Sequence, residues 1–238
     1  MKRIIRETED GSKTIYIEDW DETYHSIHGA VQEASHVFIQ NGFHHFVENK
    51  LPVKIIEIGL GTGLNSFITL MEAEKHKILV QYVGIEKFPV SDEEFEMVNY
   101  FENVFKLYPE FEDRKNEFLN YYQQLFHSNW ENWHKISSYF EFKKVEEDFF
   151  NLKNINENNF DLVYFDAFGS RVQPELWEKE LLEIVDSLTK KSAIFTTYAA
   201  KGTIKRGLKD LGYIVQKRPG PPGKREMMVG RKDFSFVK

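Results

Sequence analysis

Three glycines alternate with other residues directly after an acidic side chain, in Glu57-Ile58-Gly59-Leu60-Gly61-Thr62-Gly63. Glycine lets the backbone approach a ligand closely, and the first amide groups of a following helix are free to point toward it. A β-branched run at 53–58 precedes this loop, and a helical pattern at 64–75 follows it. The combination predicts a loop that binds a nucleoside-containing molecule, with a purely structural turn as the alternative.

The spacing of the glycines argues against a dinucleotide cofactor. The fingerprint G-x-G-x-x-G needs a third glycine where this chain has Leu64, because that glycine lets the helix pack closely on the strand. The spacing found, E-x-G-x-G-x-G, resembles motif I of the class I methyltransferases, which implies that Glu57 faces the amino group of S-adenosyl-L-methionine. A carboxylate suits this cofactor, which carries an ammonium and a sulfonium and has no pyrophosphate. The other loop residues implied in cofactor binding are Gly59, Gly61, Thr62 and Gly63.

Three further carboxylates follow predicted strands. Glu86 closes an apolar run at 80–85, where an acid accepts hydrogen bonds from ribose hydroxyls. Asp148 follows the next strand and is expected near the adenine amino group, although a helix cap explains it almost as well. Asp166 follows a buried strand, at the sheet edge where open α/β folds bind ligands. There a carboxylate could orient an amine and accept its proton, so Asp166 is the candidate catalytic residue, with a loop-capping aspartate as the alternative.

The elements that would position these residues alternate between strands and helices. Continuous apolar runs are typical of strands buried on both faces of a parallel sheet, so we expect the α/β class with a Rossmann-like, doubly wound sheet. Asp10-Gly11 predicts a β-hairpin turn at the start of the chain. The apolar spacing within 27–46 predicts a helix, and Asn41-Gly42 marks the predicted end of that helix. The later strands are predicted at 140–145, 160–165, 192–198, 213–217 and 225–230.

An aromatic-rich stretch at 91–137 interrupts this alternation. Its spacing predicts a helical insertion of two or three helices, whose aromatic side chains pack on the sheet rather than stack on bases. We expect residues 1–238 to form a single domain, with the hairpin and first helix in 1–50.

Composition excludes several classes of function. The chain has no cysteine, so a disulfide framework, a thiolate zinc site and a cysteine nucleophile are impossible, and no metal site is expected. The amino terminus is charged too early for a signal peptide, and no apolar run approaches the roughly 18 residues of a membrane span. We therefore expect a cytoplasmic protein without a membrane partner.

Charge is distributed unevenly along the chain. The whole chain has a net charge of −7, yet residues 201–238 contain 11 Lys and Arg against 3 Asp and Glu. Such asymmetry indicates contact with a polyanion or, equally well, a solvated basic surface.

Blocks spread over nearly the whole sequence resemble one family, the bacterial tRNA wobble-uridine methyltransferases, which methylate 5-aminomethyl-(2-thio)uridine at position 34. The most restrictive blocks are Tyr24-His25-Ser26-Ile27-His28-Gly29-Ala30, Glu33-Ala34-Ser35-His36-Val37-Phe38 and Pro219-Gly220-Pro221-Pro222-Gly223-Lys224-Arg225-Glu226-Met227. Further blocks lie at 10–12, 165–168, 174–177 and 197–202.

This resemblance implies a class I S-adenosyl-L-methionine methyltransferase fold. Glu33 and Ser35 would help line the cofactor pocket, and Asp166 would be the active-site acid. The bifunctional members carry a flavin-dependent oxidoreductase after this domain; since the chain ends at Lys238, we expect the stand-alone form without a flavin domain, linked to other enzymes that make the aminomethyluridine. The residues that could contact tRNA phosphates are Lys201, Lys205, Arg206, Lys217, Arg218, Lys224 and Arg225.

Two other functions stay open at this point. A polyamine-synthase-like aminopropyltransferase also combines a glycine loop with an acid in an Asp-Ala-aromatic context, but its decarboxylated cofactor and the basic segment at 201–238 fit less well. A non-catalytic RNA-binding relative could keep the fold, although the intact acids at 57, 86, 148 and 166 argue against it.

Overall fold

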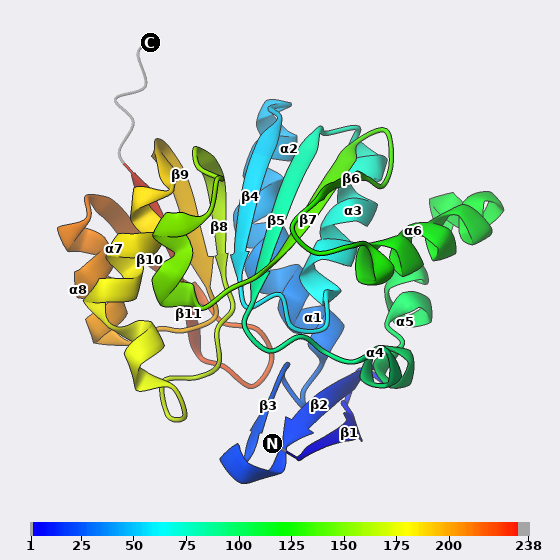
Figure 1. Cartoon of the computed structure of the whole chain (residues 1–238), viewed down its shortest axis with the longest axis horizontal. Helices are drawn as coiled ribbons and strands as arrows, with labels where there is room; N and C mark the ends of the chain where they lie inside the picture. Colours follow the sequence, from blue (N-terminus) through cyan, green and yellow to red (C-terminus); the bar gives the residue numbers. More distant parts are fainter. Residues whose placement is uncertain (1, 233–238) are drawn as a thin grey trace.

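An eight-stranded sheet forms the centre of the protein, which a computed structural model describes for residues 2–232 (Figure 1). The end of the basic segment, 233–238, lies outside the described residues. The strand order is β10-β11-β9-β8-β4-β5-β7-β6, and the five strands from β9 to β7 run parallel. The predicted strands are all present, with ends shifted by up to three residues: β4 (Val53–Ile58), β5 (Val80–Glu86), β7 (Phe140–Glu146), β8 (Phe160–Phe165), β9 (Thr189–Thr197), β10 (Tyr213–Pro219) and β11 (Glu226–Lys232).

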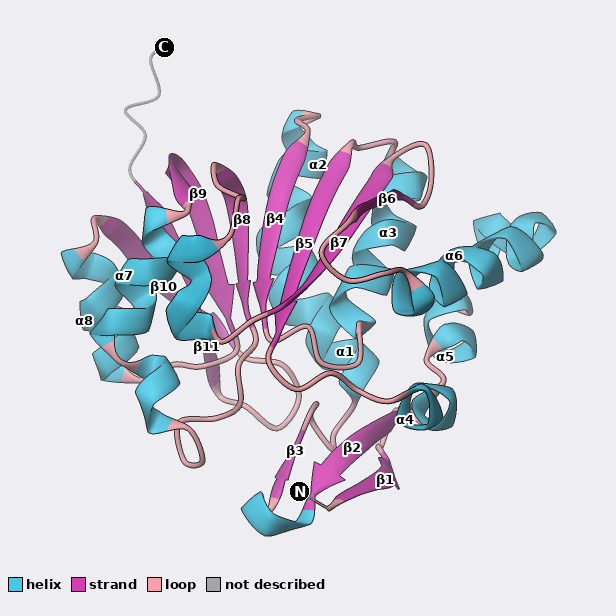
Figure 2. Ribbon diagram, viewed as in Figure 1, coloured by secondary structure: helices cyan, strands magenta, loops and turns pink. Residues whose placement is uncertain are grey.

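Helices cover both faces of this sheet (Figure 2). Successive side chains of a strand point to opposite faces, so Ile55 of β4 packs under α3 (Leu64–His76), and Ile56 packs on the side of α7 (Lys179–Ser187). The predicted doubly wound α/β class is thereby confirmed. Helix α8 (Gly202–Asp210) also packs on the α7 side. The short edge strand β6 spans Trp133–Lys135.

The hairpin predicted at the start of the chain is confirmed. Strands β1 (Arg3–Glu7) and β2 (Lys13–Ile17) pair antiparallel around Asp10-Gly11, and β3 (Glu22–Thr23) extends them to a small sheet. This hairpin lies across the carboxyl ends of the central strands, at the bottom of Figure 1.

The stretch at 91–137 contains α4 (Asp92–Val98), α5 (Phe101–Phe105) and α6 (Lys115–His127). Ser91 and Glu94 form a capping box that starts α4. The aromatic residues of these helices are largely buried and stack on one another, as the 4.8 Å between the ring centroids of Phe95 and Tyr122 shows. They belong to the core, as expected. Among the described residues, no helix combines the length and the apolar character that a bilayer crossing needs.

The predicted end of the first long helix near Asn41-Gly42 is wrong. The helix starts as α1 (Ala30–Ala34), continues as a π-helical segment (Ser35–Phe43) and ends with α2 (His44–Asn49). Gly42 is buried against the sheet, and a Cβ atom at this position would lie 3.1 Å from Cγ2 of Thr196. The glycine is therefore needed for close packing, whereas Lys50, with a φ of 53°, ends the helix.

Enlarging Gly42 should destabilise the protein. We expect Gly42→Val to lower the free energy of unfolding by about 1–3 kcal/mol, because the added methyl groups overpack the contact with Thr196 and Leu162. Urea unfolding measures the change. The matched control is Gln40→Val, at an exposed position of the same helix, which should change stability by less than about 0.5 kcal/mol. Equal effects of the two variants would refute the packing role of Gly42.

Candidate active site

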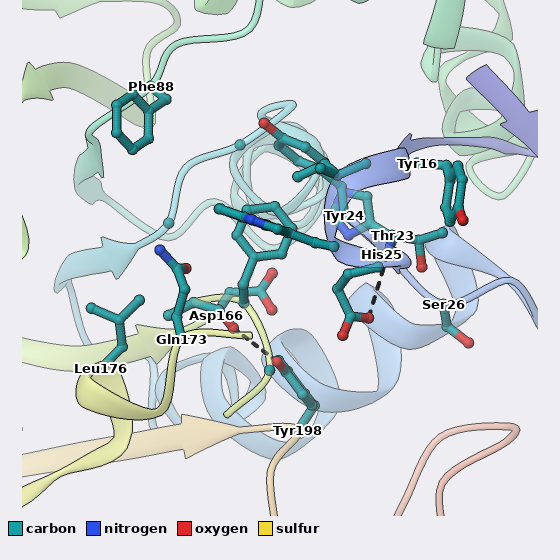
Figure 3. Close-up of a pocket in the computed structure, with 18 of the residues that line it drawn as sticks. Tyr16, Thr23, Tyr24, His25, Ser26, Phe88, Asp166, Gln173, Leu176 and Tyr198 are labelled. Carbon is teal, nitrogen blue, oxygen red and sulfur yellow. Dashed lines mark hydrogen bonds between the residues drawn. The ribbon is translucent and has the colours of Figure 1, made fainter. Parts of the chain in front are cut away.

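A cavity of about 580 Å³ lies between the carboxyl ends of the central strands and the N-terminal hairpin (Figure 3). This volume is within the roughly 300–1,000 Å³ of small-molecule sites. The sheet contributes Glu86 at the end of β5 and Asp166 directly after β8, and the hairpin side contributes Tyr24 and His25. Tyr198, just beyond β9, closes the remaining side.

The glycine loop forms part of the wall of this cavity. Gly59 and Gly61 have φ angles of 90° and 53°, a region that side chains disfavour. A Cβ atom on Gly59 would lie 2.7 Å from the carbonyl oxygen of Asp166. The loop thus needs glycine in order to run close to the end of β8.

Glu86 holds the glycine loop against the end of β5. Its carboxylate accepts hydrogen bonds from the backbone N–H groups of Gly61 and Phe88, both at 2.9 Å. Burial raises the pKa of Glu86, and these hydrogen bonds partly oppose that rise. Since each carboxylate oxygen can accept a second hydrogen bond, Glu86 keeps acceptor capacity toward the cavity that it lines.

Glu57 lies beneath the loop and is fully buried. Its two oxygens accept hydrogen bonds from Nδ2 of Asn65 at 2.7 Å and from the hydroxyl of Tyr82 at 2.8 Å. Burial raises the pKa of Glu57 well above its ordinary value, and the neighbouring carboxylate of Asp166 raises it further. Glu57 is not among the residues that line the described cavity, and its contact with the cofactor stays a prediction.

Asn65 joins Glu57 to Asp166. The same amide nitrogen that contacts Glu57 donates a second hydrogen bond, of 2.8 Å, to Oδ2 of Asp166. Burial raises the pKa of Asp166 to about 7, with a contribution from the negative charge of Glu33. The Asp166 carboxyl therefore exchanges its proton near neutral pH, which is the property expected of a general acid or base.

Glu33 and Lys224 meet on the opposite wall. The Glu33 carboxylate accepts the backbone N–H of Ser26 at 2.8 Å and forms an ion pair with the Lys224 ammonium. That ammonium lies 3.8 Å from the ring centroid of Tyr198, and the Tyr198 hydroxyl donates to the Ala167 carbonyl at 2.8 Å. Glu33 thus lines the cavity, and its contact with the cofactor stays a prediction.

Other predicted residues lie at the edge of the cavity or outside it. Asp148 lines the cavity, but its carboxylate also caps the short helix at 149–154 and pairs with Lys87 at 2.7 Å. Ser35 is not part of this wall. Thr62 and Gly63 border a second cavity, of about 340 Å³, on the side of α6.

The predicted tRNA contacts do not gather in the cavity, with one exception. Lys224 is part of its wall. Lys201, Arg206 and Arg225 are exposed and Lys205 is partly exposed, outside that wall. Two further predicted contacts lie on β10. Lys217 forms an ion pair with Glu226, and Arg218 donates a hydrogen bond to the side-chain oxygen of Asn41.

Sequence reasoning missed Asn65, Tyr198 and His25 as site residues. Asn65 stands two positions after the last loop glycine, in the first turn of α3, where a polar residue points back to the strand ends. His25 donates or accepts a 2.8 Å hydrogen bond with the hydroxyl of Thr62, and burial lowers its pKa to about 4. Both His25 and Tyr198 lie in blocks that carried the resemblance, but their roles depend on contacts between distant segments.

Comparison with known proteins identifies the chemistry of this site. Residues 109–233, more than half of the chain, match the family model described as S-adenosyl-L-methionine-dependent methyltransferase. The chain belongs to this family of methyltransferases. The predicted cofactor and the enzyme class are thereby confirmed, and the aminopropyltransferase alternative is not favoured.

Curated relatives cover the chain almost completely. The bifunctional protein MnmC of tRNA 5-methylaminomethyl-2-thiouridine biosynthesis from Leptospira borgpetersenii is 29% identical over 89% of this chain. The protein of the same name from Actinobacillus pleuropneumoniae is 28% identical over 94%. The methyltransferase spans only about a third of the length of these relatives, 32% and 34%.

A solved structure shows the same fold. The crystal structure of MNMC2 from Aquifex aeolicus aligns with 96% of this chain and 70% of its own, with a TM-score of 0.71 and 20% sequence identity. The predicted class I methyltransferase fold is therefore confirmed.

The cavity fits S-adenosyl-L-methionine. Gly59 and Gly61, which have no side chains, form part of its wall and leave the backbone open to a ligand. Glu86 and Asp148, the residues predicted for the ribose hydroxyls and the adenine amino group, both line the cavity.

The raised pKa of Asp166 makes stability depend on pH. Aspartate titrates near about 3.9 in an unfolded chain and at about 7 here, so the folded state binds this proton more tightly. The stabilising contribution of the neutral carboxyl is complete below about pH 4 and is lost as the pH rises to about 7.

We expect Asp166→Asn to raise the free energy of unfolding by about 2 kcal/mol at pH 8 and to change it little at pH 4. This change in free energy is about half of what the full pKa shift of Asp166 implies, because the carboxyl is partly exposed and water screens its charge. Urea unfolding of the wild type and the variant at both pH values measures the difference. An effect of equal size at pH 4 and pH 8 would contradict the assigned pKa.

Proposed function

We propose that this methyltransferase transfers a methyl group to the primary amine of 5-aminomethyl-(2-thio)uridine at wobble position 34 of tRNA. The observation that carries the proposal is Asp166, a carboxyl with a pKa of about 7 on the wall of the cofactor cavity. The named activity of the MnmC relatives supports the choice of substrate. We also propose that residues 1–238 act as one methyltransferase domain and that the protein works in the cytoplasm, where its tRNA substrate is.

Asp166 would prepare the substrate amine for reaction. A primary amine is largely an ammonium near neutral pH, and only its neutral form has the lone pair that attacks carbon. Asp166 accepts one proton of this ammonium, and Asn65 fixes the orientation of the accepting carboxylate through its 2.8 Å hydrogen bond. When bound, the cofactor supplies a methyl group on a positively charged sulfur, and the amine nitrogen gains this methyl as the carbon–sulfur bond breaks.

Aromatic side chains at the mouth of the cavity would hold the uracil ring. The ring of Phe168 lies edge-on to Trp20 and Tyr24, at 5.4 Å and 4.9 Å between centroids, and all three residues line the cavity. Proteins that recognise single-stranded RNA stack exposed bases on such rings. The hairpin would thus provide the nucleobase side of the site and the sheet the cofactor side.

The substrate already carries its aminomethyl group, so a different reaction must supply it. We therefore propose a functional link to an enzyme that installs this group on the wobble uridine.

Nucleoside mass spectrometry tests the function and the role of Asp166 together. Transfer RNA from cells that lack the gene should contain 5-aminomethyl-(2-thio)uridine, and the purified protein with S-adenosyl-L-methionine should convert it to the methylated form. We expect Asp166→Asn to lower kcat by about 10²–10⁴-fold, because a general base contributes that much, while the affinity for the cofactor changes little.

Asp161→Asn is the matched control. Asp161 lies at the opposite end of the same strand and accepts the backbone N–H of Lys54 at 2.9 Å, so its variant should keep wild-type kcat. An unchanged nucleoside profile of tRNA from cells that lack the gene would refute the proposed substrate. Wild-type kcat in Asp166→Asn would refute only the role of Asp166.

The exposed basic residues predict salt-dependent tRNA binding. We expect the triple variant Lys201→Ala, Arg206→Ala, Arg225→Ala to weaken tRNA binding for all sequences and to reduce the slope of log K against log salt by about 2–3, because each phosphate contact contributes roughly 0.7–0.9. Filter binding between about 50 mM and 200 mM salt measures the slope. The control is a triple alanine variant at Lys135, Lys153 and Lys191, which are all exposed and outside the predicted tRNA contacts. It should keep the wild-type slope. Equal slopes in both triple variants would count against this surface.

A further inference from the structure

Two histidines and a glutamate meet on the side of the protein formed by α2 and α3. His44 is the first residue of α2, and Glu72 and His76 lie one turn apart at the end of α3. One ligand atom from each of the three residues lies within 4.8 Å of the other two. The glycine loop is at the opposite end of α3, roughly 12–18 Å away along the helix axis. The cluster is therefore separate from the methyl-transfer cavity.

The spacing of these atoms suits a metal ion. Oε2 of Glu72 lies 2.9 Å from Nε2 of His44 and 3.3 Å from Nε2 of His76. Zinc binds nitrogen and carboxylate oxygen at about 2.0–2.2 Å in a tetrahedral arrangement. At this bond length, tetrahedral ligand atoms are separated by about 3.3–3.6 Å. The two distances to Glu72 differ from this separation by a few tenths of an ångström, and the ligand atoms of the two histidines lie within 4.8 Å of each other.

The second oxygen of Glu72 is already fixed. The Tyr108 hydroxyl donates a hydrogen bond of 2.8 Å to Oε1 of Glu72, which leaves Oε2 directed at both imidazoles. Hydrogen bonds of this kind orient metal-binding carboxylates and strengthen binding. The Glu72 side chain is only 10% exposed, whereas His44 and His76 are 36% and 33% exposed, so an ion can reach the cluster from solvent and keep water as a further ligand.

We propose that His44, Glu72 and His76 bind a divalent transition-metal ion of the zinc type, with water in the fourth position. Such an ion would join α2 to the end of α3 and thereby stabilise the contact between the first long helix and the helix that follows the glycine loop. From the sequence no metal site was predicted, because the chain contains no cysteine to supply thiolate ligands. His44 lies 28 residues before Glu72. Only folding brings the two helices together.

Calorimetric titration of the tag-free, chelator-treated protein with Zn²⁺ tests this site. We expect one ion per chain, and a rise in Tm of about 5–10 °C at 100 times the dissociation constant. His44→Ala and His76→Ala should each weaken Zn²⁺ binding by at least about 10-fold, and Tyr108→Phe, which leaves the three ligands in place, by about 10-fold. Co²⁺ should give the visible absorption of a low-symmetry, histidine-ligated ion in the wild type and lose it in both histidine variants.

His45→Ala is the matched control, since His45 neighbours His44 in the same helix and is outside the cluster. It should bind Zn²⁺ as the wild type does. The proposal would be overturned if the folded wild type did not bind Zn²⁺, or if His44→Ala and His76→Ala bound Zn²⁺ as tightly as the wild type. Circular dichroism of each variant shows whether it is folded, so that loss of Zn²⁺ binding can be distinguished from unfolding. Methyl transfer is measured separately, so failure of this site leaves the proposed function unaffected.

Discussion

One amide group holds two carboxyl groups together at the centre of this enzyme. Nδ2 of Asn65 donates to Glu57 at 2.7 Å and to Asp166 at 2.8 Å. Two buried carboxylates cannot both ionise cheaply at short range, and burial already favours their neutral forms. Burial is the main cause of the raised pKa of both groups; the charge of Asp166 adds to the rise at Glu57 and that of Glu33 to the rise at Asp166, while the hydrogen bonds from Asn65 oppose both shifts. The remaining buried oxygen of Asn65 has no hydrogen-bond partner within residues 2–232.

The topology of the sheet explains why this contact forms where it does. β4 pairs with β8 on one side and with β5 on the other, so the chain leaves β4 toward one half of the sheet and later returns to build the other half. Such a switch point opens a crevice at the carboxyl ends of the strands. Glu57 is the penultimate residue of β4 and Asp166 directly follows β8, the two strands that border this crevice, and α3, which carries Asn65, begins directly above it.

Much of the sheet and its acids could be predicted from sequence because both depend on local patterns. Apolar runs marked β4, β5 and β8, and Glu86 and Asp166 followed from their positions at strand ends. Gly42 was misinterpreted as a helix end because its actual contact, with Thr196, joins residues far apart in the chain. The same reason hid the bridge through Asn65 and the position of the hairpin across the cavity.

The placement of predicted cofactor residues shows a similar limit. Glycine spacing identifies the loop, but it does not tell which side of the loop faces the ligand. Gly59 borders the larger cavity, Thr62 and Gly63 border the smaller one beside α6, and Gly61 borders both. Glu57 ends the correct strand but is turned inward toward Tyr82.

A crystal structure of the complex with S-adenosyl-L-homocysteine, the product of methyl transfer, tests the account most directly. The account predicts that the ribose hydroxyls contact Glu86 and that the sulfur atom faces Asp166, with the product in the 580 Å³ cavity. Product bound in the cavity beside α6, or with its sulfur directed away from Asp166, would contradict it.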